Sequence, residues 1–226
     1  MTRGVAVTQF ADRRDAGRRL AEPLRSYAAR ADVIVLGLPR GGVPVAYEVA
    51  SELRLPLDVM PVRKLGVPDQ EELAFGAIAS GGVRVLNADV IADAHLTPEQ
   101  IQAVTADQQL ELERREQLYR GEAPPPRLRG LTAIVVDDGL ATGATMRAAI
   151  QAVCEQGGKA VVAVPVGAAS TRAAISSCAD AVVCLLTPTR FVAVGHWYGD
   201  FGATGDDEVR ELLALGNARR AMPAER

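Results

Sequence analysis

The 226-residue chain is 48% hydrophobic and 23% charged, which is a globular composition, and it holds only two histidines and three cysteines. These counts exclude a three-histidine zinc site and a disulfide framework. The net charge of −3 comes from basic and acidic residues that are spread along the chain, so no nucleic acid partner is expected. No apolar run approaches about eighteen residues, so we expect a cytoplasmic protein with no membrane partner.

The first part of the chain alternates between helical and strand patterns. Apolar residues at helical spacing predict a helix that begins near Asp12 and is strained at Pro23. The continuous apolar run 33–38 is typical of a strand covered on both faces, and a helix over 45–53 and a strand over 57–62 follow it. This order predicts a βαβ unit.

The segment 63–87 has a different character. Two short apolar runs flank Ser80-Gly81-Gly82, which predicts an antiparallel hairpin, and we interpret the segment as a flexible arm. Thr97-Pro98-Glu99-Gln100 is a capping box that begins a long helix, expected to continue to Arg120 and to be ended by Pro124-Pro125-Pro126.

The remainder of the chain repeats the strand and helix alternation. It predicts strands over 133–136, 160–166 and 181–186, and helices over 143–155, 171–177 and 206–215. From Gly216 to residue 226 we expect a frayed tail. The sequence has no internal repeat and no long linker, so residues 1–226 are predicted to form one α/β domain. Its expected architecture is an open, mostly parallel sheet with helices on both faces, an inserted arm and a small covering segment.

The most informative motif joins the strand over 133–136 to the helix that follows it. An acidic pair, Asp137-Asp138, ends the strand, and the small-residue loop Gly139-Leu140-Ala141-Thr142-Gly143-Ala144-Thr145 enters the helix. Backbone N–H groups of such a loop, the helix N-terminus and two threonine hydroxyls can bind a phosphate. Two carboxylates at a strand's carboxyl end can accept hydrogen bonds from ribose hydroxyls. The alternative is that the acidic pair is only a solvated strand end.

Residues Ala133 to Thr145 resemble the signature of the type I phosphoribosyltransferases, which bind phosphoribosyl pyrophosphate. Gly139 departs from that signature, because the family usually has a larger apolar residue there, and the smaller residue could loosen the loop. The motifs GxxxxGK[ST], GxGxxG after a strand and GxSxG are absent from the sequence, which argues against P-loop, Rossmann and nucleophile-elbow proteins. The resemblance implies that Asp137 and Asp138 hold the ribose and that residues 141–145 hold the 5′-phosphate.

A second glycine-rich turn, Pro39-Arg40-Gly41-Gly42, follows the strand over 33–38. By itself such a turn is more often plain turn chemistry than a binding site. It resembles the pyrophosphate-binding loop of the same family, where a cis non-proline peptide often directs amides at the leaving group. The resemblance implies that Arg40 and the amides of residues 40–42 bind pyrophosphate.

Two further segments lie where the family places mobile parts of its site. The start of the arm, Arg63-Lys64, and the later Glu72 look like the catalytic loop of adenine and orotate phosphoribosyltransferases, which implies that Lys64 meets pyrophosphate and Glu72 meets the acceptor. A solvent-facing ion pair is the alternative. Residues 187–201 fall where the family's hood covers the acceptor base, and Trp197 or Tyr198 could stack on it, although aromatics near a last strand are more often core.

The resemblance implies an enzyme that transfers the phosphoribosyl group from phosphoribosyl pyrophosphate to a nitrogenous acceptor, which the sequence does not identify. Magnesium is the implied cofactor, held mainly by the substrate, with no metal site of the protein's own; relatives are commonly homodimers. The implied catalytic residues are Arg40, Lys64, Glu72, Asp137 and Asp138. The implied substrate contacts are Pro39, Arg40, Gly41, Gly42, Arg63, Asp137, Asp138, Gly139, Leu140, Ala141, Thr142, Gly143, Ala144, Thr145 and Trp197. A non-catalytic sensor of phosphoribosyl pyrophosphate or nucleotides, or a hydrolase on the same scaffold, remains an alternative.

Overall fold

The computed structural model describes residues 9–221, without the side chains of Glu72 and of residues 219–221. Its larger sheet is built from five parallel strands, which is the predicted fold class. In spatial order they are β2 (Leu57–Val59), β1 (Val33–Gly37), β6 (Thr132–Val136), β7 (Lys159–Val166) and β8 (Ala181–Leu186).

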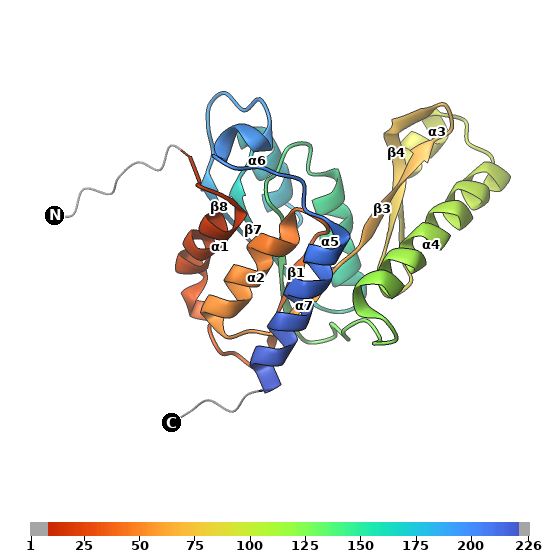
Figure 1. The fold of residues 1–226 in the computed structure, drawn as a ribbon. Coiled ribbons are helices and arrows are strands. Elements are labelled where there is room, and N and C mark those ends of the chain that lie inside the picture. The colour runs from red at the N-terminus through yellow and green to blue at the C-terminus, as the bar shows by residue number, and fades with distance from the viewer. Residues whose placement is uncertain (1–8, 222–226) are drawn as a thin grey trace.

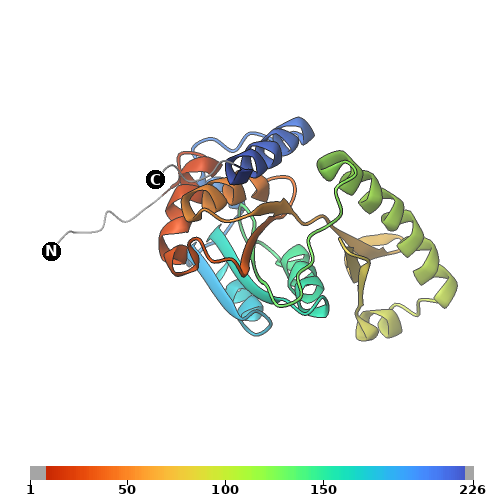
Figure 2. The same cartoon turned by 90° about the horizontal axis from the view of Figure 1, so that it is seen from below.

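Helices cover both faces of this sheet, as Figure 2 shows from below. Successive residues of the central strands point to opposite faces, so Val33 and Val35 join one buried cluster while Ile34 and Leu36 join the other. The first cluster packs against α1 (Arg13–Ala21), α2 (Gly42–Leu53) and α7 (Asp206–Ala221). The second packs against α5 (Ala144–Glu155) and α6 (Ala169–Ser176).

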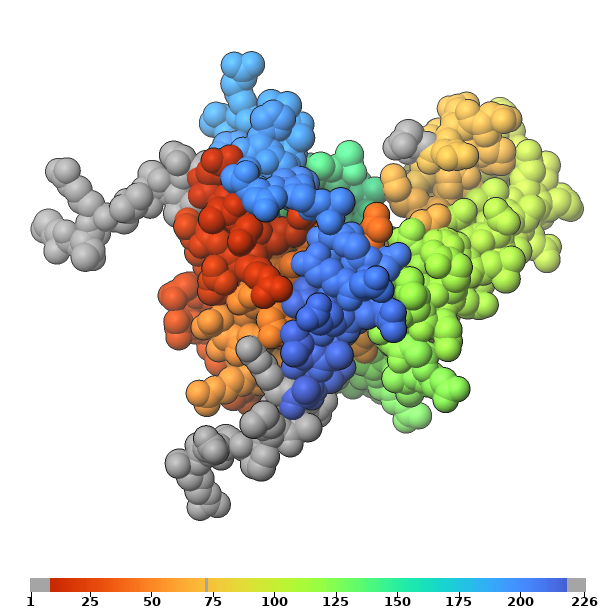
Figure 3. Space-filling model, in the orientation of Figure 1, coloured from red at the N-terminus to blue at the C-terminus, as the bar shows by residue number. Residues whose placement is uncertain are grey.

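The arm is a second, antiparallel sheet that projects to one side of the core (Figure 1). Its strands are β3 (Val62–Val67), β4 (Gln70–Ala79) and β5 (Val83–Leu86), followed by α3 (Ala88–Asp93) and α4 (Pro98–Arg120). The hairpin around residues 80–82 is therefore confirmed. The arm has a buried cluster of its own, in which Leu65, Phe75 and Leu112 of α4 meet. In the space-filling view its outer end stands apart from the core (Figure 3).

The capping box at Thr97 is also confirmed. The Thr97 side chain accepts a hydrogen bond from the Gln100 N–H at 3.3 Å, and the Gln100 side chain accepts one from the Thr97 N–H at 2.9 Å. Helix α1 gives way to a 3₁₀ turn, η1 (Glu22–Tyr27), at the residues around Pro23. The strain expected at that proline thus appears as a change of helix type.

The structure differs from the predicted elements in three main places. The predicted strand 57–62 is interrupted at Met60-Pro61: β2 ends at Val59, and Val62 begins β3 in the other sheet. Helix α3 was not expected, because it is short and none of its residues is buried. The predicted frayed tail begins too early, since α7 continues to Ala221; residues 222–226 lie outside the described residues.

Candidate active site

The two glycine-rich loops meet at the centre of the parallel sheet. Strand β1 lies beside β6, and the chain leaves β1 toward β2 on one side but leaves β6 toward β7 on the other. The connections therefore diverge between β1 and β6, which is the switch point where open α/β sheets bind ligands. The Leu38 N–H donates to the Val136 carbonyl at 2.9 Å, so the ends of the two strands are joined directly.

The loop after β1 is seated against the acidic pair by its glycines. A Cβ at Gly41 would lie 2.1 Å from Oδ2 of Asp138, and one at Gly42 would lie 2.7 Å from the Val136 carbonyl. Side chains at both positions are excluded, so the loop can approach the end of β6 only with glycines. The Pro39–Arg40 peptide bond is cis, as the resemblance implied.

The groups that this loop offers to a ligand differ from the prediction in one respect. The Gly42 N–H donates to the Leu38 carbonyl at 3.0 Å, so the expectation that its amide faces a ligand is wrong. The N–H groups of Arg40 and Gly41 donate to no backbone acceptor among residues 9–221. The Arg40 side chain is exposed, which leaves its guanidinium accessible to an anion.

Each carboxylate of the acidic pair has one oxygen held by the protein. Oδ1 of Asp137 accepts the backbone N–H of Asp138 at 2.9 Å, and Oδ2 of Asp138 accepts Nε of Arg13 at 2.9 Å. Within residues 9–221 the second oxygen of each carboxylate accepts no hydrogen bond, which leaves two acceptors for a ligand. This arrangement suits two neighbouring hydroxyl groups.

The surroundings of the pair make the two carboxyl groups unequal. Burial raises the pKa of Asp137 well above its ordinary value, and the charge of Asp138 adds to that rise. Burial also raises the pKa of Asp138, but the Arg13 guanidinium opposes the rise. The Arg13 guanidinium opposes the rise in both pKa values, but it is hydrogen-bonded only to Asp138, which favours Asp138 as the more readily ionised member.

The loop after β6 presents a row of backbone N–H groups at the start of α5. Among residues 9–221, no N–H from Ala141 to Thr145 donates to a backbone group outside the helix, and the first N–H groups of a helix have no intrahelical acceptor. Gly143 has a φ of 73°, which turns the chain into α5. A phosphate is the ligand that such a row and a helix N-terminus favour.

Leu140 has a different role from its predicted contact with substrate. Its side chain is buried, its N–H donates to the Val166 carbonyl at 2.8 Å, and its carbonyl accepts the Ala168 N–H at 3.0 Å. The Thr171 hydroxyl donates to the Ala141 carbonyl at 2.6 Å. These bonds to the end of β7 and to α6 fix the loop, so Leu140 anchors the row rather than forming part of it.

The hood, residues 187–201, contacts the loop after β6 directly. The Tyr198 hydroxyl donates to the Asp138 carbonyl at 2.5 Å, and burial raises the pKa of Tyr198, so the donated proton stays on the hydroxyl. A Cβ at Gly139 would lie 2.5 Å from Cγ1 of Val194. The expectation that Gly139 loosens the loop is therefore wrong, because Val194 fills the space of the missing side chain.

Trp197 packs among the side chains that hold the hood against the core. It is half-buried and packs against the cluster that contains Phe10, Val166 and Tyr198, and its buried indole N–H has no acceptor in the described part of the chain. The structure thus gives the ring a packing role, which the sequence had left as the alternative to stacking on a base.

Arg13 is the site residue that the sequence did not reveal. It is the first residue of α1, its Nε donates to Asp138, and one of its terminal nitrogens donates to the Gly202 carbonyl at 2.7 Å. Its guanidinium lies 3.9 Å from the centroid of the Phe201 ring. No spacing pattern links positions 13 and 138, so only the folded chain brings them together.

The two basic residues at the start of the arm point in opposite directions. Nε of Arg63 donates to Gln108 of α4 at 2.9 Å, so Arg63 faces the arm's own helix rather than a substrate. Lys64 is exposed and, by strand alternation, shares its face with Val62, which packs against the core. Glu72 lies in β4, but its side chain is outside the described residues.

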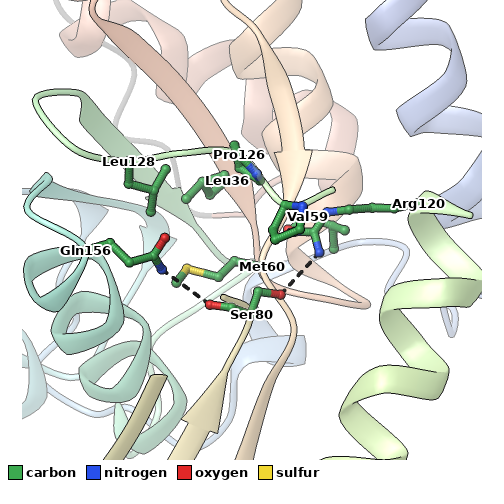
Figure 4. Close-up of a pocket in the computed structure, with 9 residues that line it drawn as sticks. Leu36, Val59, Met60, Ser80, Arg120, Pro126, Leu128 and Gln156 are labelled. Atoms are coloured by element: carbon green, nitrogen blue, oxygen red, sulfur yellow. Dashed lines mark hydrogen bonds between the residues drawn. The ribbon is translucent and has the colours of Figure 1, made fainter. Parts of the chain in front are cut away.

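The base of the arm is tied to the core through Arg120, the last residue of α4. Its guanidinium is 5% exposed, lies 2.9 Å from Asp58, and also donates to the Val59 carbonyl. It donates to Oγ of Ser80 at 3.3 Å, while Gln156, the residue after α5, donates to the Ser80 carbonyl at 3.3 Å. Figure 4 shows Ser80 between these two partners, in a small pocket at the junction of arm and core.

An open parallel sheet whose switch point carries an amide row and an acidic pair is typical of proteins that bind phosphorylated ligands. Residues 6–198 match the family model described as a phosphoribosyl transferase domain. The chain belongs to this phosphoribosyltransferase family.

Known relatives agree with this assignment. Two Mycobacterium tuberculosis proteins, from strains CDC 1551 and H37Rv, are each 53% identical over 205 residues and are provisionally named phosphoribosyl transferases. The match covers 90% of this chain but 46% of theirs, so the chain spans about half the length of these curated relatives. The crystal structure of TT1426 from Thermus thermophilus is 41% identical, with a TM-score of 0.82 over 92% of this chain and 98% of that one.

Two further properties of the described residues concern the binding of a metal ion and the crossing of a membrane. Residues 9–221 contain no group of three or more His, Cys, Asp or Glu side chains that could hold a metal ion. Magnesium at phosphate sites commonly keeps several waters and is bound largely through substrate phosphates, so the magnesium that the resemblance implies needs no cage of protein side chains. Among the described helices, none combines the length and apolar character that a bilayer crossing requires.

Proposed function

We propose that the protein transfers the phosphoribosyl group of phosphoribosyl pyrophosphate to a nitrogenous acceptor and releases pyrophosphate. The observation that carries the proposal is the row of N–H groups from Ala141 to Thr145, which directly follows an acidic pair with two open carboxylate oxygens. A sugar phosphate with two neighbouring hydroxyls complements both features at once.

The substrate's ribose phosphate end is assigned to the loop after β6. The open oxygens of Asp137 and Asp138 accept hydrogen bonds from the two ribose hydroxyls. The N–H row binds the 5′-phosphate, and the hydroxyls of Thr142 and Thr145 add two donors. The helix dipole contributes only about 0.3–2 kcal/mol, so most of the phosphate affinity comes from the converging hydrogen bonds.

The leaving group is assigned to the loop after β1. The exposed Arg40 guanidinium and the available N–H groups of Arg40 and Gly41 bind pyrophosphate, on which negative charge grows as the bond to C1 breaks. Lys64 adds a further positive charge when the arm approaches the crevice, and that approach keeps water away from C1. Bound magnesium would supply charge neutralisation on the pyrophosphate oxygens.

The transfer is balanced without a protein nucleophile. The C1–O bond breaks with its electron pair leaving on pyrophosphate, and the acceptor nitrogen forms the new bond to C1. The acceptor nitrogen's proton then passes to solvent or to a nearby base, for which Glu72 is the candidate on the arm. The residues act by orienting the substrate and by stabilising charge.

A pyrophosphate-release assay across purine, pyrimidine and other nitrogen acceptors, with magnesium present, tests the proposal. Release that depends on one class of acceptor is the expected result. Binding of phosphoribosyl pyrophosphate without release for any acceptor would instead indicate a sensor. Release that is independent of an acceptor would indicate a hydrolase.

A further inference from the structure

Arg13 connects four parts of the candidate site that are distant in the sequence. It stands at the start of α1, bonds Asp138 at the end of β6, and reaches the hood side through Phe201 and Gly202. Its Nε also lies 3.4 Å from the position of a Cβ at Gly41, at the pyrophosphate loop. The side chain is 13% exposed, so this placement is built into the fold rather than adopted on the surface.

We propose that Arg13 is a positioning residue that orients the Asp138 carboxylate for a ribose hydroxyl and couples it to the end of the hood, at Phe201 and Gly202. The proposal rests on the proposed function for the identity of the ligand. It does not give Arg13 a contact with the substrate. Arg13 acts through Asp138 on one side and through Phe201 and Gly202 on the other.

The orientation follows from which oxygen Arg13 occupies. Its Nε donates a hydrogen bond to Oδ2 of Asp138. Because the side chain of Asp138 is also only 16% exposed, the carboxylate has little freedom to turn. Oδ1 is left as the acceptor for a ligand. Without Arg13 the carboxylate could rotate, and either oxygen could turn away from the crevice.

Charge gives Arg13 a second effect on Asp138. The titratable groups that face Asp138 are Asp137 on the same strand end, Arg13 on α1 and the protonated Tyr198 hydroxyl on the hood. Among these, only Arg13 is cationic and lowers the pKa of Asp138. Its loss raises that pKa further, so ligand binding that needs the carboxylate weakens at a higher pH than in the wild type.

A lysine cannot reproduce the full set of contacts. The guanidinium uses separate nitrogens for Asp138 and Gly202 while its plane contacts the Phe201 ring, whereas an ammonium is a single compact charge. Arg13→Lys therefore keeps the charge but loses the coupling. Arg13→Gln removes the charge and ends the side chain at the position of the arginine Nε.

The test is a carboxyl-carbon NMR titration of the free protein, with Asp138→Asn to assign the Asp138 signal. We expect the Asp138 midpoint to move upward in Arg13→Gln and to stay near the wild-type value in Arg13→Lys. Arg18→Ala is the matched control, because Arg18 lies on the same helix, is half-exposed and pairs with Glu48 at 3.7 Å. It should leave the midpoint unchanged.

The second measurement is calorimetric binding of phosphoribosyl pyrophosphate with magnesium across pH. In Arg13→Gln the affinity should fall about 10- to 100-fold, and the pH below which binding weakens should be higher than in the wild type. In Arg13→Lys the affinity should fall several-fold at every pH. Effects of this size are expected when bonds to charged groups are lost.

Three results would overturn the role of Arg13: an unmoved Asp138 midpoint in Arg13→Gln, an equal affinity loss at all pH values in that variant, or wild-type affinity in Arg13→Lys. If Arg13→Gln does not fold, Arg13→Lys still decides the coupling. A wild-type protein that binds no phosphoribosyl pyrophosphate would refute the proposed function instead, and the NMR titration would still decide whether Arg13 controls Asp138.

Discussion

Replacing Gly41 by alanine should separate the two loops of the candidate site. The new Cβ would lie 2.1 Å from Oδ2 and 2.8 Å from Cγ of Asp138, well inside contact distance. Gly41 has a φ of −61°, so alanine is compatible with the backbone and the clash is the whole perturbation. Asp138 is bonded to Arg13 at 2.9 Å, so a displacement of its carboxylate also disturbs that bond.

The size of the effect follows from this geometry. Forcing an extra carbon into a packed site costs about 1–3 kcal/mol. At roughly 2–4 °C of melting temperature per kcal/mol for a chain of this length, Gly41→Ala should lower the Tm by roughly 2–12 °C. The displaced carboxylate should also lose its ribose contact, so binding of phosphoribosyl pyrophosphate should weaken together with stability.

A double-mutant cycle with Asp138→Ala isolates the clash. Asp138→Ala removes both atoms with which the new Cβ would clash, so in that background Gly41→Ala should cost less than about 0.5 kcal/mol in denaturant unfolding. The coupling energy between the two positions should then be about 1–3 kcal/mol. An equal cost of Gly41→Ala in both backgrounds would refute the reasoning that the loop after β1 rests on Asp138.

Three further substitutions test the electrostatics of the acidic pair and the contact between the loop after β6 and the hood. Asp137→Asn should stabilise the ligand-free protein at neutral pH, because burial raises the folded-state pKa of Asp137 above its unfolded value. Between those two pKa values the folded state binds more protons than the unfolded one, so wild-type stability falls as pH rises. The gain in stability of Asp137→Asn should be about 1.4 kcal/mol for each tenfold difference in proton affinity between the folded and unfolded states. Thermal melts should show that the gain disappears at low pH. A gain that is independent of pH would contradict the raised pKa of Asp137. Gly139→Val should lower the Tm because Val194 occupies its space, and Val194→Ala should recover part of the loss; no recovery would contradict the contact.

The sequence predicted those parts of the fold whose signals are local. The central strands β1 and β6 are apolar runs buried on both faces, and the long helix of the arm begins with a capping box, so their patterns need no partner to be recognised. The strand predicted over 57–62 failed because Met60 continues an apolar pattern while the chain passes from one sheet to another. Periodicity reports burial, not which sheet a residue joins.

The candidate site also contains residues with a local sequence pattern and residues without one. The acidic pair and the loop to Thr145 carry a local pattern, and the structure joins them to the loop at Arg40, as the resemblance implied. Arg13, and Val194 against Gly139, carry no local pattern, since each meets a residue more than fifty positions away. Arg63 was assigned from the resemblance of the start of the arm to the family's catalytic loop, and strand alternation turns it toward α4 instead.

Calorimetric titration of the wild type, Asp138→Asn and Arg40→Ala with phosphoribosyl pyrophosphate and magnesium tests the central claim most directly. The loops at the ends of β1 and β6 should form one binding site, so the wild type should bind one equivalent. Each variant should remain folded and bind at least about tenfold more weakly, because each loses bonds to a charged group. Wild-type affinity in both folded variants, or no binding by the wild type, would contradict the account.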